Sequence, residues 1–171
     1  MTVATDLLVD ALDRVRDSVH TVLEGLAGPQ LTYRADPEAN TIAWLVWHLT
    51  RVQDDHVADV AGRDQSWHED DWCERFGLPF DRDEHGYGHT PEQVGAVDVP
   101  ADLLRDYHDA VHARTVGYLR SLADEDFARI VDERWNPPVT LGVRLVSVVN
   151  DCTQHVGQAA FVRGAAERAG G

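Results

Sequence analysis

The stretch TLGVRLVSVVNDCTQHVGQAAFVRG, from Thr140 to Gly164, decides the fold, because both ends of a long helix can be identified in it. Pro137 and Pro138 prevent an earlier helix, and Thr140 can cap the first free backbone N–H groups. Gly164 suits the left-handed residue that follows a last helical turn. The sequence therefore predicts one long helix over residues 140–164.

An apolar stripe runs along this predicted helix. At about 100° per residue, apolar side chains recur on one side of the axis, so this side needs a core to pack against. The stripe consists of Leu141, Leu145, Val148, Val149, Cys152, Val156 and Ala159.

Asp151 and His155 lie on the flank of this stripe. Because they are four residues apart, they lie about 40° from each other around the axis, and their side chains project side by side from adjacent turns. A helix can offer two ligands to one metal ion in this way. A salt-bridged surface pair has the same spacing, and on this helix alone it is the more ordinary interpretation.

Composition limits the class of protein. The 171 residues, of which 43% are hydrophobic, can bury a core without disulfides, so we expect one domain over residues 1–171. The chain has 30 acidic and 15 basic residues, a net charge of −15, and every basic residue is arginine. This charge argues against nucleic acid or an anionic membrane as a partner, since both require a cationic face.

Cysteine content and the N-terminus indicate a cytoplasmic protein. Cys73 and Cys152 form neither a C-x-x-C motif nor a disulfide framework, and Cys152 is expected to be a small buried apolar residue. The first residues, MTVATDLLVDALDRV, have acids within their apolar pattern and lack the basic start of a signal peptide. No window approaches 18 uncharged apolar residues, so no membrane span is expected.

Three further helices are predicted from apolar residues at helical spacing. The first starts at Thr5 and Asp6 and ends at Gly28 and Pro29. The second covers residues 41–62, with Asn40 or Thr41 as its cap, and the third runs from about Pro100 to Leu122. Four long helices without an internal repeat predict an all-α fold, a four-helix bundle.

The segment 62–99 connects the second and third predicted helices. It is too aromatic for a disordered linker and too irregular for a long helix. We expect a long ordered crossover over one end of the bundle. A capping box with proline at the first helical position, Thr90-Pro91-Glu92-Gln93, predicts one short helix within it.

His48 is the candidate ligand on the second helix. It shares a face with Trp44, Arg51 and Asp55, where an imidazole can be oriented through its second nitrogen. The alternative is a core-edge histidine that is hydrogen-bonded to Asp55, and for His48 in isolation we favour this alternative. His56 falls within the apolar sector of the same helix.

Other side chains compete for a functional role. His108 and His112, four residues apart, form a second candidate ligand pair, although we favour a pair at the rim of the bundle. Aromatic residues of the crossover are candidate pocket walls, but packing of the loop onto the bundle explains them equally well. They are Trp67, Trp72, Phe76 and Tyr87.

Facing helices of a bundle commonly hold metal ions between inward-facing side chains. His48 with Asp151 and His155 would supply two imidazoles and one carboxylate, which leaves coordination positions open for water or substrate. Open positions indicate chemistry rather than a structural metal.

Two segments carry a resemblance to a known family. NTIAWLVWHLTRVQDD, residues 40–55, and DCTQHVGQAAFVRG, residues 151–164, resemble the DinB/YfiT-like superfamily, and within it the metal-binding N-terminal domain of mycothiol-dependent maleylpyruvate isomerase. The order of elements agrees over essentially the whole chain. The resemblance implies that His48, Asp151 and His155 are the metal ligands. Asp151 departs from the pattern, since relatives usually have glutamate or histidine there.

The resemblance also implies thiol activation. A divalent metal, zinc with nickel or iron as alternatives, would hold a mycothiol-like thiol as its thiolate for transfer to, or isomerisation of, a small electrophile. Arg51 and Arg163 are candidates to bind a carboxylate of thiol or substrate, and surface ion pairs would explain them as well. Asp55 is the expected partner of His48.

Two hypotheses from different classes follow. The first is a metal-dependent thiol S-transferase or isomerase. The second is a non-catalytic, stress-associated metal-binding bundle that acts through dimerisation or partner binding, because many members of the family have no assigned reaction. A hydrolase that uses metal-bound water is a third alternative, and a homodimer is compatible with each.

Overall fold

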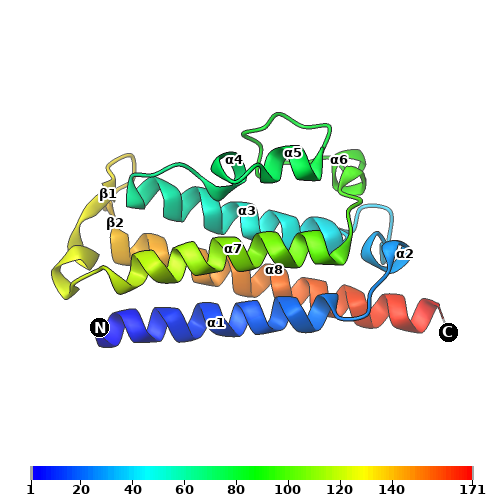
Figure 1. The fold of residues 1–171 in the computed structure, drawn as a ribbon, viewed down its shortest axis with the longest axis horizontal. Coiled ribbons are helices and arrows are strands. Elements are labelled where there is room, and N and C mark those ends of the chain that lie inside the picture. Colours follow the sequence, from blue (N-terminus) through cyan, green and yellow to red (C-terminus); the bar gives the residue numbers. More distant parts are fainter. Residues whose placement is uncertain (1, 171) are drawn as a thin grey trace.

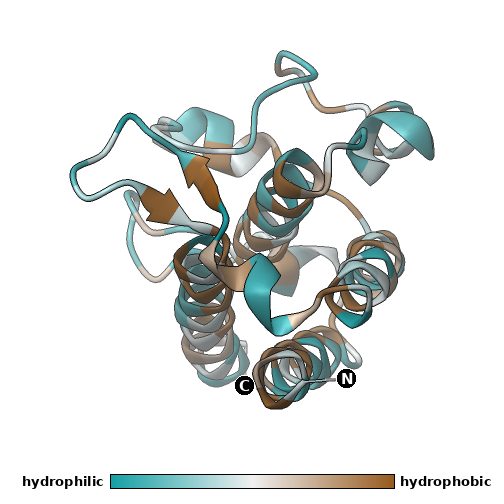
Figure 2. Ribbon diagram, turned by 90° about the vertical axis from the view of Figure 1, so that its left-hand side faces the viewer, coloured by the Kyte–Doolittle hydropathy of each residue, from teal (hydrophilic) through white to brown (hydrophobic). Residues whose placement is uncertain are grey.

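The structure, a computed structural model, describes residues 2–170. Its frame consists of four long helices that lie side by side, namely α1 (Val3–Leu23), α3 (Ile42–Ala61), α7 (Ala101–Arg120) and α8 (Leu141–Ala169) (Figure 1). Helices α1 and α3 each contact both α7 and α8, so the four form a closed bundle, seen close to its long axis in Figure 2. The predicted all-α bundle is confirmed.

Short elements connect the long helices. They are α2 (Gly28–Leu31), α4 (Ser66–Glu69), α5 (Trp72–Phe76), α6 (Pro91–Ala96), the 3-10 helix η1 (Asp124–Ala128), and the strands β1 (Ile130–Asp132) and β2 (Val139–Thr140). The two strands pair in antiparallel fashion just before α8.

The helix starts follow the predicted caps. Thr41 accepts a hydrogen bond from the backbone N–H of Trp44 at the start of α3, and Thr140 accepts one from Val143 at the start of α8. The first helix begins at Val3, two residues earlier than predicted, with Thr2 as its cap.

Two predicted helix ends are wrong. The first long helix ends at Leu23, and Gly28 and Pro29 instead begin the short helix α2. Helix α8 continues past Gly164 to Ala169. A glycine inside a helix costs only about 1 kcal/mol relative to alanine, and the helix-forming sequence AAERA follows it.

The crossover takes a different path from the one we expected. It lies along the side of the bundle formed by α3 and α7 rather than over an end (Figure 1). Trp67, Trp72 and Phe76 are buried, and the centroids of their rings lie 5.3, 5.3 and 5.6 Å from that of Tyr107 in α7. These three aromatic residues therefore attach the crossover to the bundle. The predicted capping box at Thr90 is present.

The histidine pair of α7 does not lie at the rim, as predicted. His108 is fully buried, and its Nδ1 lies 3.1 Å from the hydroxyl of Thr50. His112 is also buried and contacts Asp13 of α1 at 2.8 Å. Since the two rings are 6.5 Å apart and each has its own partner, they connect α7 to its neighbours instead of forming one ligand pair.

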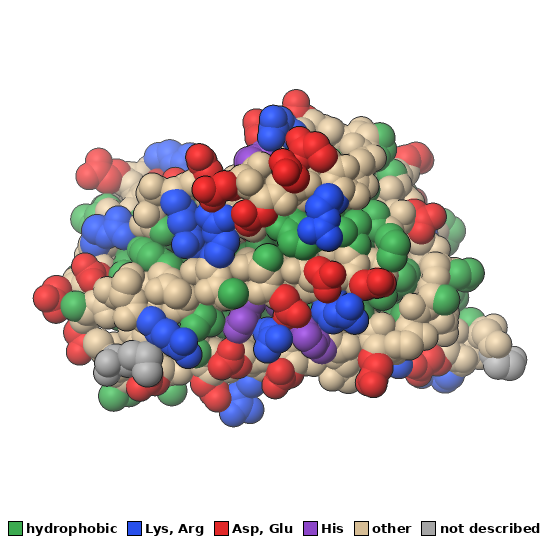
Figure 3. All heavy atoms as spheres, viewed as in Figure 1, with side chains coloured by type: hydrophobic (Ala, Val, Ile, Leu, Met, Phe, Trp, Pro, Cys, Tyr) green, Lys and Arg blue, Asp and Glu red, His purple; other side chains and the backbone are tan. Residues whose placement is uncertain are grey.

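Surface charge is mixed on the face shown in Figure 3. Acidic side chains and arginines alternate over α1 and α7, and this face has no continuous basic area. Within residues 2–170, no helix is both long enough and apolar enough to span a bilayer.

Candidate metal centre

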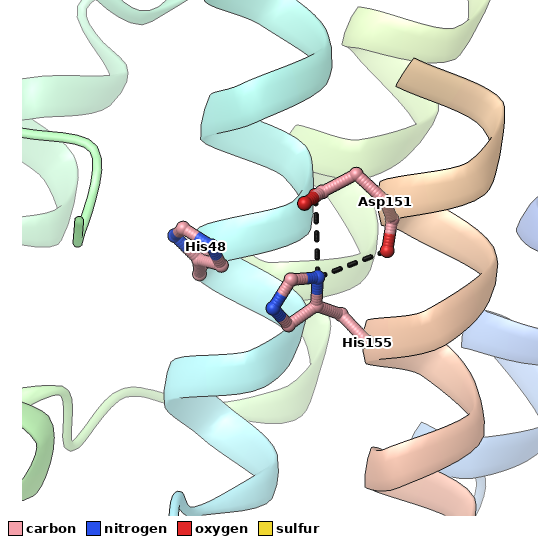
Figure 4. Close-up of side chains that lie close together, drawn as sticks. All are labelled: His48, Asp151 and His155. Carbon is pink, nitrogen blue, oxygen red and sulfur yellow. Dashed lines mark hydrogen bonds and ion pairs between the residues drawn. The ribbon is translucent and has the colours of Figure 1, made fainter. Parts of the chain in front are cut away.

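Three side chains that are far apart in the sequence converge between α3 and α8. His48 comes from α3, and Asp151 and His155 come from adjacent turns of α8, which packs against α3 (Figure 4). One ligand atom from each of the three lies within 4.8 Å of the others. The side chains of Asp151 and His155 project side by side from α8, as the D-x-x-x-H spacing predicts, and they face the imidazole of His48 on α3.

His48 is oriented by the backbone of the crossover. Its Nδ1 lies 2.5 Å from the carbonyl oxygen of His85. A carbonyl can only accept, so Nδ1 carries the proton and Nε2 carries a free lone pair. The ring also stacks on Trp44 at a centroid distance of 4.6 Å, and burial lowers the pKa of His48 to about 4. His48 is therefore a neutral imidazole at neutral pH.

The predicted bond between His48 and Asp55 is absent. Asp55 instead accepts a hydrogen bond of 2.8 Å from the side chain of Gln65. The actual partner, the carbonyl of His85, lies 37 residues away in the chain.

His155 is oriented in the same way as His48. Its Nδ1 lies 2.9 Å from the backbone carbonyl oxygen of Asp151, so Nε2 is again the nitrogen with the free lone pair. The rings of His48 and His155 meet edge to face at a centroid distance of 4.6 Å.

Asp151 supplies the negative charge of the centre. Burial acts to raise its pKa, but the contact with His155 outweighs this effect and holds the pKa below the ordinary value, and the same contact raises the pKa of His155. Carboxylate Oδ2 lies 3.2 Å from Nδ1 of His155 (Figure 4), yet it has no hydrogen-bond partner among the described residues, because that N–H is directed at the carbonyl. This buried oxygen thus has capacity for a further cationic partner.

This donor set fits a divalent metal ion. Metal-binding imidazoles usually donate one ring N–H to a carbonyl or carboxylate, which fixes the other nitrogen as the ligand, and both histidines have this arrangement. Two imidazole nitrogens and one carboxylate oxygen are the ligand types of catalytic zinc and non-haem iron sites.

A cavity of about 150 Å³ opens beside the centre. In addition to His48 and Asp151, it is lined by Val52, Asp55, His56, His85 and Tyr87. Tyr87 is thus the one aromatic residue of the predicted pocket wall that lines this cavity. A larger hollow of about 490 Å³ between α1 and α7 includes none of the three converging side chains.

Sequence reasoning missed His56 and His85 as cavity residues. The apolar periodicity of the second predicted helix includes His56, although a histidine two turns after His48 could have suggested the same face. His85 lies in an irregular segment without a periodic pattern, so no local signal placed it near α3.

The two candidate arginines lie elsewhere. Arg51 is fully buried beneath the crossover, where it donates to the side chain of Gln65 at 2.6 Å and stacks on Trp67 at 4.7 Å. Arg163 donates to the carbonyls of Thr21 and Val22 at the end of α1. Neither guanidinium lines the cavity, and both make structural contacts, with Nη2 of Arg51 left buried without a hydrogen-bond partner among the described residues.

Comparisons with known proteins identify the family and agree with the fold. A family model described as mycothiol-S-transferase matches residues 7–167. The chain is also similar to a solved structure, described as a conserved protein from Enterococcus faecalis, with 33% identity and a TM-score of 0.89 over 95% of this chain and 96% of that one. A comparison with curated proteins gave no match.

Proposed function

Since the chain belongs to the mycothiol-S-transferase family, we propose that it is a divalent-metal-dependent transferase that joins a small mycothiol-type thiol to a small electrophile. The observation that carries this proposal is the convergence of His48, Asp151 and His155, in which Nδ1 of each histidine bonds to a backbone carbonyl and Nε2 is left as the ligand nitrogen. A location in the cytoplasm, where thiols are reduced, fits this activity.

The three side chains would hold the ion and leave positions open for the thiol. When bound, an ion such as zinc supplies the positive charge that lowers the pKa of a thiol from about 8.5 and holds it as a thiolate. His48 and His155 would each contribute Nε2, whose direction is fixed before binding by the hydrogen bond of Nδ1. Because the contact with Asp151 raises the pKa of His155, the protonated form of this ring would release its proton when the ion binds. Asp151 compensates part of the positive charge. Nickel and iron accept the same donors, so metal analysis identifies the ion.

The nucleophile must come from the thiol cosubstrate. Cys152 follows Asp151 in sequence, but it points into the core, where it is fully buried and burial raises its pKa. Burial also raises the pKa of Cys73, which lies outside the cavity beside the centre. A thiolate is the reactive form, so neither residue is suited to attack an electrophile.

The test combines metal content with thiol transfer. Purified wild type is assayed with mycothiol and 1-chloro-2,4-dinitrobenzene, beside His48→Ala and His155→Ala, with and without a chelator. We expect turnover that requires metal and is lost in both variants. If both variants turn over as fast as the wild type and the chelator has no effect, the proposal is contradicted. It is also contradicted if the only activity is hydrolysis of ester substrates without thiol.

One observation favours the non-catalytic alternative with a homodimer. Helix α8 exposes Val143, Val146 and Phe161, with 54%, 59% and 69% of each residue accessible. Exposed apolar side chains that lie together suit contact with a second copy, and Val143 and Val146 lie within one turn of each other. A metal-loaded protein that dimerises and gives no chelator-sensitive turnover with mycothiol would favour this alternative over the transferase.

A further inference from the structure

His56 lines the same cavity as His48 and Asp151 but takes no part in the three-residue cluster. It lies eight residues after His48 on α3, which corresponds to about 12 Å along the helix axis. The cavity thus extends from the metal centre to another titratable ring, and His56 is placed to contact the far end of a small molecule.

The tautomer of His56 is fixed by Arg144 of α8. Nη1 of Arg144 lies 3.1 Å from Nδ1 of His56, and a guanidinium can only donate, so Nδ1 accepts and the proton is on Nε2. Arg144 is itself held by Asp132 at 3.2 Å, and these two side chains are only 14% and 4% exposed. Asp55 lies farther from Nδ1, at 3.6 Å. Burial lowers the pKa of His56, which agrees with the neutral ring.

The Nε2–H group of His56 remains free for a ligand. Within residues 2–170 this group makes no hydrogen bond. The side chain of His56 is 39% exposed and lines the cavity, so a ligand can reach it. Nδ1 of His85, a cavity residue from the crossover, is buried without a partner among these residues. Polar groups in this condition are normally satisfied by water or by a ligand.

The charges of the cavity restrict its ligand. Asp55 and Asp151 both line it, and no arginine does. Asp55, which lies 3.6 Å from His56 and is not one of the proposed metal ligands, disfavours an anionic group near this ring, whereas the fixed N–H of His56 favours an acceptor. A volume of about 150 Å³ restricts the ligand to a small one.

We propose that this cavity is the electrophile site of the transferase, and that His56 donates a hydrogen bond from Nε2 to an oxygen acceptor of a small uncharged electrophile. The proposal rests on the transferase function proposed above. The acceptor oxygen lies away from the carbon that sulfur attacks, so His56 sets specificity and orientation. Arg144 is a positioning residue, because it acts only through the ring of His56.

Two matched electrophiles test this role. With 4-nitrobenzyl chloride or benzyl chloride, the thiolate sulfur forms a bond to the benzylic carbon and chloride leaves with the electron pair of the C–Cl bond. The thiol proton goes to the buffer. The reaction involves no oxidation or reduction, and only the first electrophile carries an oxygen acceptor.

The variants are His56→Leu, which removes the donor, and His56→Gln, which keeps a side-chain N–H. We expect His56→Leu to lower the ratio of kcat/KM for 4-nitrobenzyl chloride to that for benzyl chloride by about tenfold, the size of one hydrogen bond. His56→Gln should retain more of the ratio. His20→Leu, a histidine outside this cavity, is the control. An unchanged ratio in His56→Leu beside an active wild type would overturn the proposal.

Two further measurements do not depend on turnover. Imidazole ¹⁵N spectra should show His56 protonated at Nε2 in the wild type, and Arg144→Met should shift the ring toward a mixture of tautomers. Binding of unreactive 4-nitrobenzyl alcohol should weaken in His56→Leu. If the wild type transfers no thiol, the transferase fails, but these measurements still decide the role of His56. Equal binding by wild type and His56→Leu, or a wild-type Nδ1–H tautomer, would overturn it.

Discussion

At position 86 the crossover backbone passes directly against the ring of His48. Gly86 has a φ of +101°, and a Cβ built there would lie 2.7 Å from Nδ1 of His48 and 3.1 Å from the rings of Trp44 and Trp47. A side chain at this position would have to displace the imidazole or the loop that orients it. A residue outside the ligand set therefore determines where a ligand points.

Gly86→Ala should weaken metal binding by about 10- to 100-fold, the usual effect of disturbing a group that orients a ligand. Gly88→Ala is the matched control, since Gly88 also has a positive φ of +76°, but a Cβ at this position would have no atom within 4 Å. Metal titration of the two variants separates backbone strain from displacement of His48. Equal metal affinity in both variants would contradict the positioning role of Gly86.

The charge of Asp151 leads to a second prediction at the residue scale. Asp151→Asn keeps the size of the side chain but removes the negative charge, so metal affinity should fall by more than the roughly 100-fold expected for an orienting group. Asp151→Glu keeps the charge and should retain more affinity. Competition with a chromogenic chelator measures both. Wild-type affinity in Asp151→Asn would mean that this carboxylate is not a ligand.

The sequence predicted only part of this site. Helical spacing made His48, Asp151 and His155 candidates without excluding a surface pair or a core-edge histidine, and the resemblance to the DinB/YfiT-like superfamily selected these three as the expected ligands. His85 and Gly86 could not be predicted, because they approach α3 through an irregular segment whose path is set by tertiary packing. The buried aromatic residues of the crossover hold this segment against Tyr107 of α7, and no local sequence pattern predicts that contact.

At the scale of elements, α3 depends on its first turn. Thr41 is fully buried, and its hydroxyl accepts the N–H of Trp44 at 3.1 Å. Thr41→Ala should lower the free energy of unfolding by about 1–2 kcal/mol, the cost of losing an N-cap. Thr153→Ala, at an exposed position in the middle of α8, is the control. Urea unfolding that gives the same midpoint for both variants would contradict the capping role.

The four long helices could be predicted from the sequence, but some of their ends could not. The apolar stripe of α8 identified the helix because Leu141, Leu145 and Cys152 must pack against something, and all three are buried. Gly164 was a misleading stop signal, because Val162 and Ala166 on either side of it are also buried. The packing of these two residues keeps the chain helical through a residue that would otherwise favour an end.

For the whole molecule, buried histidines predict loss of stability in acid. Burial lowers the pKa of His108 to about 3, whereas an unfolded histidine has a value near 6.5. Between these values the unfolded chain binds a proton that the folded chain does not, so stability falls as pH decreases from about 6.5. At pH 5 this one residue should cost about 2 kcal/mol.

Urea unfolding of metal-free protein at pH 7, 6 and 5 measures this effect. His108→Asn removes the titrating group, so its free energy of unfolding should decrease less between pH 7 and pH 5 than that of the wild type. A variant with the same decrease as the wild type would show that other groups cause the acid sensitivity.

The bundle as a whole holds α3 and α8 so that three side chains meet, and metal binding at this point is the central claim of our proposal. The decisive measurement is metal content per chain, by elemental analysis of wild type, His48→Ala and His155→Ala purified in parallel. We predict about one divalent ion per wild-type chain and little in either variant, as expected for a site with three protein ligands. An equal metal content in all three proteins, or none in the wild type after loading, would contradict the account.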